Sequence, residues 1–157
     1  MSELGTSRTV SRRSLRPVRQ VNGLVRPKES EQMKVALDID GTITEHPEFF
    51  AVLSSSLRAA GHRMIILTYR DPARAEATGA QLAAWGIGFD DLVIAPSLES
   101  KGALCGALGV DLFFDDQDEC ITAVPESVMV CKVRNGGNFD FAKRQWISTG
   151  RLTRLLR

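Results

Sequence analysis

From residue 34 onward, short apolar segments of strand length alternate with longer segments of helical periodicity. Two strands joined through a helix lie parallel, because the helix carries the chain back across one face of the sheet. Sheets of this kind are covered by helices on both faces. The alternation therefore predicts an α/β fold, a Rossmann-like three-layer sandwich with a five-stranded parallel sheet.

Capping residues set the expected limits of these elements. Pro47 suits the first turn of a helix, and Gly61 suits the position after its end. Asp71 and Pro72 are typical of an N-cap followed by the first helical residue, and Gly86 suits the end of that helix. We expect strands at residues 35–37, 63–68, 92–95, 110–114 and 128–133, and helices at residues 47–60, 72–85, 100–108 and 117–123.

Polar side chains gather where the predicted strands end. Asp38 follows the first strand, Thr68 ends the second, and Asp115 and Asp116 follow the fourth, while Lys101 opens a helix. Ligands of parallel sheets bind at the carboxyl ends of the strands. These five residues are therefore expected to converge on one crevice.

Asp38 and Asp40 are separated by a single residue at the end of the first apolar segment. If the strand continues, both carboxylates point to one side of it. Two like charges repel at a buried strand end, so a cation between them or a shared proton is expected. Gly41 then lets the backbone turn sharply or approach a ligand. The alternative is a strand that ends in an Asp-rich turn without function.

Residues 34–42, with the sequence KVALDIDGT, resemble motif I of the haloacid dehalogenase superfamily of phosphohydrolases. Residues 64–68 resemble its motif II, Lys101 its motif III lysine, and residues 112–116 its motif IV. The resemblance covers residues 33–133. All four motifs occur in order, which is more specific than any one of them.

The resemblance implies a magnesium-dependent phosphohydrolase that acts on a phosphate monoester through an aspartyl-phosphate. Asp38 would be the nucleophile and Asp40 the general acid and base. Thr68 and Lys101 would bind the phosphoryl group. The alternatives are a catalytically idle binding module on the same fold, and a polynucleotide phosphatase.

The resemblance also implies the ligands of Mg²⁺, which prefers oxygen donors. These would be the Asp38 carboxylate, the Asp40 carbonyl and Asp116, with Asp115 assisting through a water. Arg70 is expected either to reach the substrate or to lie on the surface. The nearby acids are expected to cap the following helix; they are Asp118 and Glu119.

Members of this superfamily that act on small metabolites carry a cap domain, for which this chain has no room. The resemblance therefore implies an open site, with a macromolecular phosphorylated substrate or a neighbouring subunit of a homo-oligomer covering it. Residues 138–157 mix aromatic and basic residues. They indicate either a nucleic-acid contact or, as we expect, a helix that packs its aromatic face on the core.

Residues 1–32 hold seven basic and three acidic residues without apolar periodicity, which predicts a flexible basic tail. The domain is expected at residues 33–157, with Met33 as an alternative start. The net charge of +1 argues against a whole-molecule nucleic-acid binder. No apolar segment is long enough to cross a membrane. The three cysteines form neither a zinc pattern nor an even disulfide set, which suits a reducing cytoplasm. His46 and His62 are expected on the surface, and Gly136–Gly137 in a loop.

Overall fold

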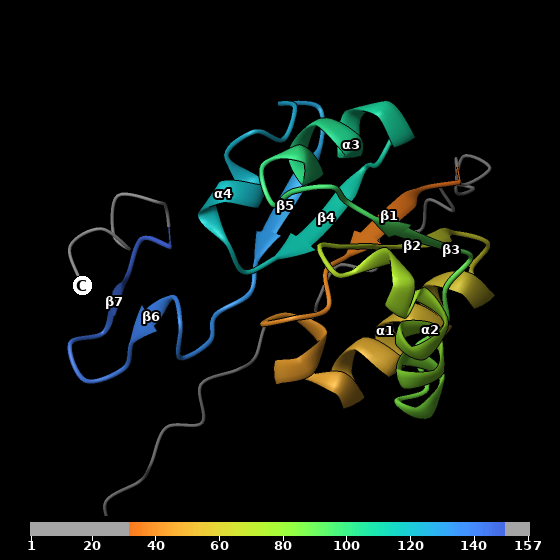
Figure 1. Cartoon of the computed structure of the whole chain (residues 1–157), viewed down its shortest axis with the longest axis horizontal. Coiled ribbons are helices and arrows are strands. Elements are labelled where there is room, and N and C mark those ends of the chain that lie inside the picture. The colour runs from red at the N-terminus through yellow and green to blue at the C-terminus, as the bar shows by residue number, and fades with distance from the viewer. Residues whose placement is uncertain (1–31, 150–157) are drawn as a thin grey trace, which may run out of the picture. The chain divides into compact units, whose positions relative to one another are not determined.

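A computed structural model describes residues 32–149, and Figure 1 shows the arrangement of their elements. The strands are β1 (Lys34–Leu37), β2 (Arg63–Thr68), β3 (Asp91–Ile94), β4 (Leu112–Asp115), β5 (Met129–Lys132), β6 (Phe139–Asp140) and β7 (Gln145–Trp146). The α-helices are α1 (Pro47–Ala59), α2 (Ala75–Ala84), α3 (Ser100–Leu108) and α4 (Asp118–Ile121), and the 3₁₀ helices are η1 (Ile43–Glu45) and η2 (Pro72–Arg74).

The first five strands form one parallel sheet in the order β3-β2-β1-β4-β5. Leu37 at the end of β1 lies opposite Ile66 of β2 and Phe114 of β4. The carboxyl ends of the three central strands therefore meet at one edge. The predicted α/β fold, a Rossmann-like three-layer sandwich with five parallel strands, is confirmed.

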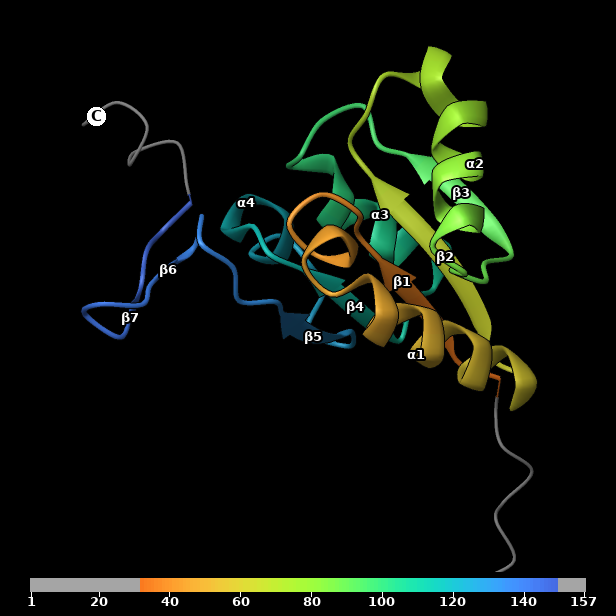
Figure 2. The ribbon, with the colours of Figure 1, turned by 90° about the horizontal axis from the view of Figure 1, so that it is seen from below.

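Helices cover both faces of the sheet, as Figure 2 shows. Side chains alternate along β1, so Val35 and Leu37 enter one core and Ala36 enters the other. The first core includes Phe50 of α1 and Leu82 of α2, and the second includes Cys105 of α3. The two apolar layers hold the sheet rigidly, so the polar residues at its strand ends have a fixed position.

The predicted limits agree with most of the elements to within a few residues. The strand at residues 63–68 is confirmed without change, and α1 ends one residue before the predicted limit. The predicted helix at residues 72–85 divides into η2 and α2. Asp71 caps the first of these two, because its carboxylate accepts a hydrogen bond from Ala73 N at 2.9 Å.

The expected helix in the C-terminal segment is wrong over the described residues. Phe139 and Asp140 of β6 pair antiparallel with Trp146 and Gln145 of β7, which makes a hairpin. Aromatic residues alternate with polar ones at residues 138–141 and at residues 145–146, a pattern that favours strands. Gly136 and Gly137 lie in the turn before β6, as predicted.

Two other predictions concern the ends of the chain and the membrane. The predicted basic tail spans residues 1–32, of which residues 1–31 lie outside the described residues. The side chain of Gln32 donates to Gly61 O at 3.0 Å. The expectation that the chain has no room for a cap domain concerns two stretches. Between β1 and β2 the chain contains η1 and α1, and between β2 and α3 it contains η2, α2 and β3. No helix among the described residues has the length and apolar character needed to cross a membrane.

Candidate metal centre

Three carboxylates meet at the carboxyl ends of β1 and β4. Asp38, Asp115 and Asp116 are all buried, and each offers an oxygen that lies within 4.8 Å of the others. The strands hold them together, since Asp38 N donates a hydrogen bond to Phe114 O at 3.0 Å. The convergence that the sequence predicts for these acids is present in the structure.

One lysine lies in this acidic cluster. Lys101, in the first turn of α3, places its Nζ 2.7 Å from Asp38 Oδ1 and 2.5 Å from Asp115 Oδ2. Its side chain is only 1% exposed. Burial by itself would lower the pKa of Lys101, but Asp38 and Asp115 outweigh burial and raise that pKa. The lysine is therefore charged, and it pairs with two of the three carboxylates.

Burial has the opposite effect on the acids. It raises the pKa of Asp38 to about 7 against the lowering effect of Lys101, and Asp115 adds a further increase. Burial also raises the pKa of Asp116. Because burial is the largest cause of both shifts, the charged forms of these acids are costly unless a cation or a proton accompanies them.

Asp115 and Asp116 differ in the partners of their oxygens. Asp115 has both oxygens occupied, by Lys101 Nζ and by Gln117 N, which donates to Oδ1 at 2.8 Å. Asp116 Oδ2 accepts from Asn135 Nδ2 at 2.8 Å, but its buried Oδ1 has no hydrogen-bond partner among the described residues. The open oxygen of the cluster therefore belongs to Asp116.

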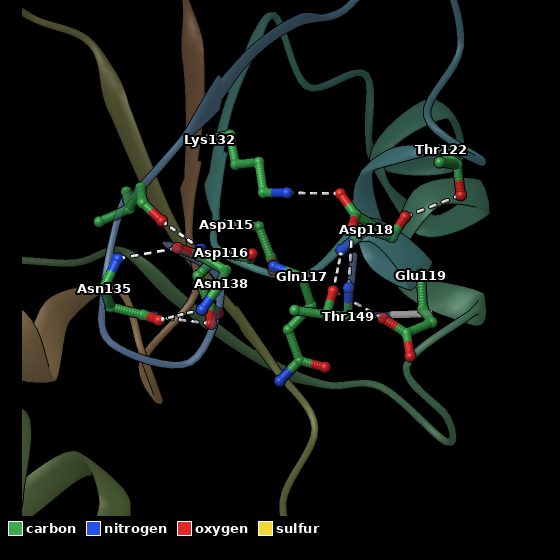
Figure 3. A network of polar contacts seen from close by, with 11 residues as sticks. Asp115, Asp116, Gln117, Asp118, Glu119, Thr122, Lys132, Asn135, Asn138 and Thr149 are labelled. Carbon is green, nitrogen blue, oxygen red and sulfur yellow. Dashed lines mark hydrogen bonds and ion pairs between the residues drawn. The ribbon is translucent and has the colours of Figure 1, made fainter. Parts of the chain in front are cut away.

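Two asparagines that follow β5 hold this part of the site in place, as Figure 3 shows. Asn135 Nδ2 donates both to Asp116 and to Gly41 O, the latter at 2.9 Å. Asn138, which is fully buried, donates to Asp116 O at 2.9 Å and accepts from Asn135 N at 2.9 Å. Sequence analysis missed both residues, although two asparagines around a glycine pair after a fifth parallel strand were a usable signal.

Gly41 makes the close approach to Asp116 possible. Its φ is +86°, and a Cβ at this position would lie 2.6 Å from Asp116 Cγ. Only glycine combines that backbone conformation with that lack of a side chain. The expectation that Gly41 allows a sharp turn near the site is consistent with this geometry.

Two hydroxyl groups near the carboxyl ends of the strands are buried without partners. Thr68 at the end of β2 and Thr42 after β1 are fully or almost fully buried. Neither Oγ1 makes a hydrogen bond with any residue from 32 to 149. Buried hydroxyls normally have a partner, so these two indicate a ligand or solvent that completes the site.

Asp40 does not lie on β1, because the strand ends at Leu37 and Asp40 falls in the turn that follows. The Asp40 side chain is 57% exposed, and both its oxygens accept from Arg70, at 2.6 and 2.7 Å. Arg70 also donates to Gln81 Oε1 at 2.8 Å. Asp40 and Arg70 line a cleft of about 580 Å³. The expectation that both carboxylates point to one side of a strand is therefore wrong.

The remaining sequence predictions have mixed outcomes. Asp118 does not cap α4: its carboxylate pairs with Lys132 Nζ at 2.5 Å and accepts from Thr149 N at 3.0 Å. Glu119 accepts from the same threonine's hydroxyl at 3.1 Å. His46 is exposed, whereas His62 is half-buried and accepts from Met33 N at 3.3 Å. The cysteines are free, with Cys105 and Cys120 buried and Cys131 half-buried.

The donor set fits a hard divalent cation. Mg²⁺ takes oxygen ligands and is commonly held by one or two carboxylates. The cluster offers only oxygen donors, one of them a buried oxygen without a partner, and an excess of negative charge. Fold and site together define a Rossmann-like α/β protein with a buried carboxylate centre at the carboxyl ends of its strands.

Comparisons with known proteins add little to this description. No family model matches the chain. No curated protein matches it either. One solved structure with a similar fold is described as a universal stress protein in complex with cAMP. It is 12% identical, with a TM-score of 0.44, and the match covers 67% of this chain and 100% of that chain.

These findings correct the family assignment. They do not support membership of the haloacid dehalogenase superfamily, because neither a family model nor a curated protein matches the chain. The magnesium-dependent phosphohydrolase function that followed from the resemblance, with its two alternatives, is withdrawn with it. At that identity and TM-score the likeness assigns no function to this chain, and the cAMP belongs to the other protein.

Proposed function

We propose that the buried carboxylate centre binds Mg²⁺ and, through it, a phosphorylated ligand. The observation that carries the proposal is the set of three buried acids with one lysine, in which Asp116 Oδ1 has no partner among the described residues. An isolated acidic cluster would relieve its repulsion by facing water. This one lies at most 6% exposed, so a cation is the natural source of the missing charge.

Asp38 and Asp116 are the proposed direct ligands. Asp115 already receives hydrogen bonds on both oxygens, so it would hold Lys101 and contact the metal only through a water. When bound, Mg²⁺ would supply the positive charge that draws a phosphate into the crevice. The Asp40 carbonyl, which the resemblance implied as a further ligand, stays a prediction.

The same crevice has groups that suit a phosphate. Thr68 Oγ1 is buried and without a partner among residues 32–149, so it has a hydrogen to donate. Lys101 supplies a fixed positive charge between Asp38 and Asp115. Arg70 and Arg74 line the cleft that also contains Asp40, and a larger phosphorylated ligand would extend there. We propose in addition that the open site is covered either by a macromolecular phosphorylated ligand or by a second copy of this chain.

Calorimetric titration with MgCl₂ tests the metal site directly. We expect the wild-type chain to bind Mg²⁺ and to gain melting temperature by mass action. Asp116→Ala should weaken binding strongly, because it removes the open oxygen. Asp118→Ala is the matched control: it removes a nearby acid that pairs with Lys132 outside the cluster. Equal losses in the two variants, or a melting temperature indifferent to Mg²⁺, would contradict the proposal.

Two further expectations stay predictions. Enzymatic activity is a separate question from binding, and assay of phosphate release by the Mg²⁺-loaded protein tests it. A reducing, cytoplasmic setting is proposed from the three free cysteines, and the unchanged melting temperature of the protein under reducing and non-reducing conditions would be consistent with it.

A further inference from the structure

The hairpin of β6 and β7 carries three aromatic rings on one face. Phe139 lies opposite Trp146 in the strand pair, and Phe141 lies in the turn directly after β6. The Phe139 ring lies 5.3 Å from that of Trp146 and 5.2 Å from that of Phe141, both edge-to-face. The rings therefore form one continuous aromatic row.

Two cations at and just after the end of β5 lie against this row. Lys132 Nζ lies 4.8 Å from the Trp146 ring centre. The Arg134 guanidinium lies 4.8 Å from the Phe139 ring and 5.3 Å from the Phe141 ring. Figures 1 and 2 both place the hairpin near α4, outside the layers of the central sheet. The bonds between Asp118 and Thr149 hold its end there.

The row is open to solvent. Phe141 is 58% exposed and Trp146 is 51% exposed, although both are large and apolar. Arg134 and Arg144 are also exposed, and neither pairs with an acid in residues 32–149. Lys143 has one distant contact, with Asp140 at 3.6 Å. The surface thus combines rings that are partly exposed with two arginines that have no acidic partner among the described residues, while Lys132 already pairs with Asp118.

We propose that this hairpin binds single-stranded nucleic acid. Unpaired bases stack on exposed aromatic rings, and phosphates pair with lysine and arginine, so the ligand matches both features of the surface. A purely apolar partner fits less well, because it would bury Arg134 and Arg144 without a counter-charge. A duplex fits less well, because its bases are already stacked.

Fluorescence anisotropy with a labelled 15-nucleotide thymidine strand tests this inference. The titration contains a metal chelator, so that its outcome does not depend on the carboxylate centre. We expect binding that weakens as salt rises, because phosphate contacts release counterions. Trp146 fluorescence should be quenched when bases stack on it, and Trp146→Phe should remove that part of the signal.

Aromatic truncation separates stacking from charge. Phe141→Ala and Trp146→Ala should each weaken binding by about 5- to 150-fold, as expected for the loss of one stacked base. Phe49→Ala is the matched control, since Phe49 is 57% exposed on α1 and lies outside the hairpin. Melting temperatures of all variants verify that they are folded.

Four outcomes would overturn the inference. The first is no binding at low salt. The second is binding that Phe141→Ala and Trp146→Ala leave unchanged, which would mean attraction by charge alone. The third is equal competition by double-stranded DNA and by heparin, since neither offers free base faces. Self-association through the hairpin, seen by light scattering and abolished by Trp146→Ala, would assign the surface to a second copy of this chain instead.

Discussion

The ammonium group of Lys101 lies 2.7 Å from Asp38 Oδ1, and both side chains are almost completely buried. The pair joins the first turn of α3 to the end of β1. It brings one positive charge to a site with three negative ones, and the remaining imbalance is the basis of the proposed Mg²⁺ site.

Replacing Lys101 should leave the acids of the site without their positive partner. Lys101→Met leaves Asp38 and Asp115 buried without their partner, which should lower the free energy of unfolding by about 3–5 kcal/mol. Mg²⁺ should restore more melting temperature in this variant than in the wild type, since the metal replaces the lost charge. Lys132→Met, which breaks a half-exposed pair with Asp118, should cost only about 1 kcal/mol. Thermal melts with and without MgCl₂ provide the comparison, and a Mg²⁺ effect smaller than in the wild type would refute the argument.

Alanine substitutions at Gly41 and Gly61 distinguish a steric clash from backbone strain. Gly41→Ala should both destabilise the protein and weaken Mg²⁺ binding, because its Cβ would displace the Asp116 carboxylate. Gly61→Ala has a similar φ of +89° but meets nothing within 4 Å. It should therefore show the strain alone, about 1 kcal/mol, with unchanged Mg²⁺ affinity. Denaturant unfolding and calorimetry measure the two effects, and a loss of affinity in Gly61→Ala would undermine this reasoning.

Thr68 is expected to serve ligand binding at a cost in stability. Thr68→Val keeps the shape of the side chain but removes a buried hydroxyl that has no partner among the described residues. We expect a gain in the free energy of unfolding, up to about 1 kcal/mol, since the unsatisfied hydroxyl is costly to bury. Binding of inorganic phosphate in the presence of Mg²⁺ should weaken. Unfolding curves and competition binding test the two halves, and a variant that is less stable yet binds phosphate normally would show a structural role instead.

Asp90 gives the protein a predictable pH dependence away from the site. Its carboxylate accepts from Met64 N at 2.8 Å and pairs with Arg58, and the hydrogen bond from Met64, followed by Arg58, lowers its pKa. A lowered pKa in the folded state adds stability above the pKa of the unfolded state. That stability is lost as pH falls through the folded-state value. The wild type should therefore lose stability between about pH 5 and pH 2.

Asp90→Asn tests this assignment because asparagine keeps the shape but does not titrate. The variant should be less stable than the wild type at pH 7, and the difference should shrink towards pH 2. Urea unfolding at a series of pH values measures it. A difference that is constant across the series would mean that Asp90 acts through its shape and not through its charge.

The positions of the acids illustrate what local sequence pattern decides. Apolar segments predicted where the parallel strands lie, and strand ends meet at one edge of any such sheet. Asp38, Thr68, Lys101, Asp115 and Asp116 were therefore predictable as neighbours. The pattern also limited the error in most helix and strand boundaries to a few residues, because capping and periodicity act within one or two turns of chain.

Partners that are distant in sequence were decided only by the tertiary structure. Asp40 looked equivalent to Asp38, yet it pairs with Arg70, which is 30 residues away. Asn135 lies 19 residues from Asp116 and determines which of its oxygens stays open. The aromatic row depends on a hairpin that the pattern had suggested as a helix. Local preferences in the sequence determined the layers of this protein and the edge at which its acids meet. The paths of the loops, which depend on packing and hydrogen bonds across the whole domain, decided which of those acids remain available to a ligand.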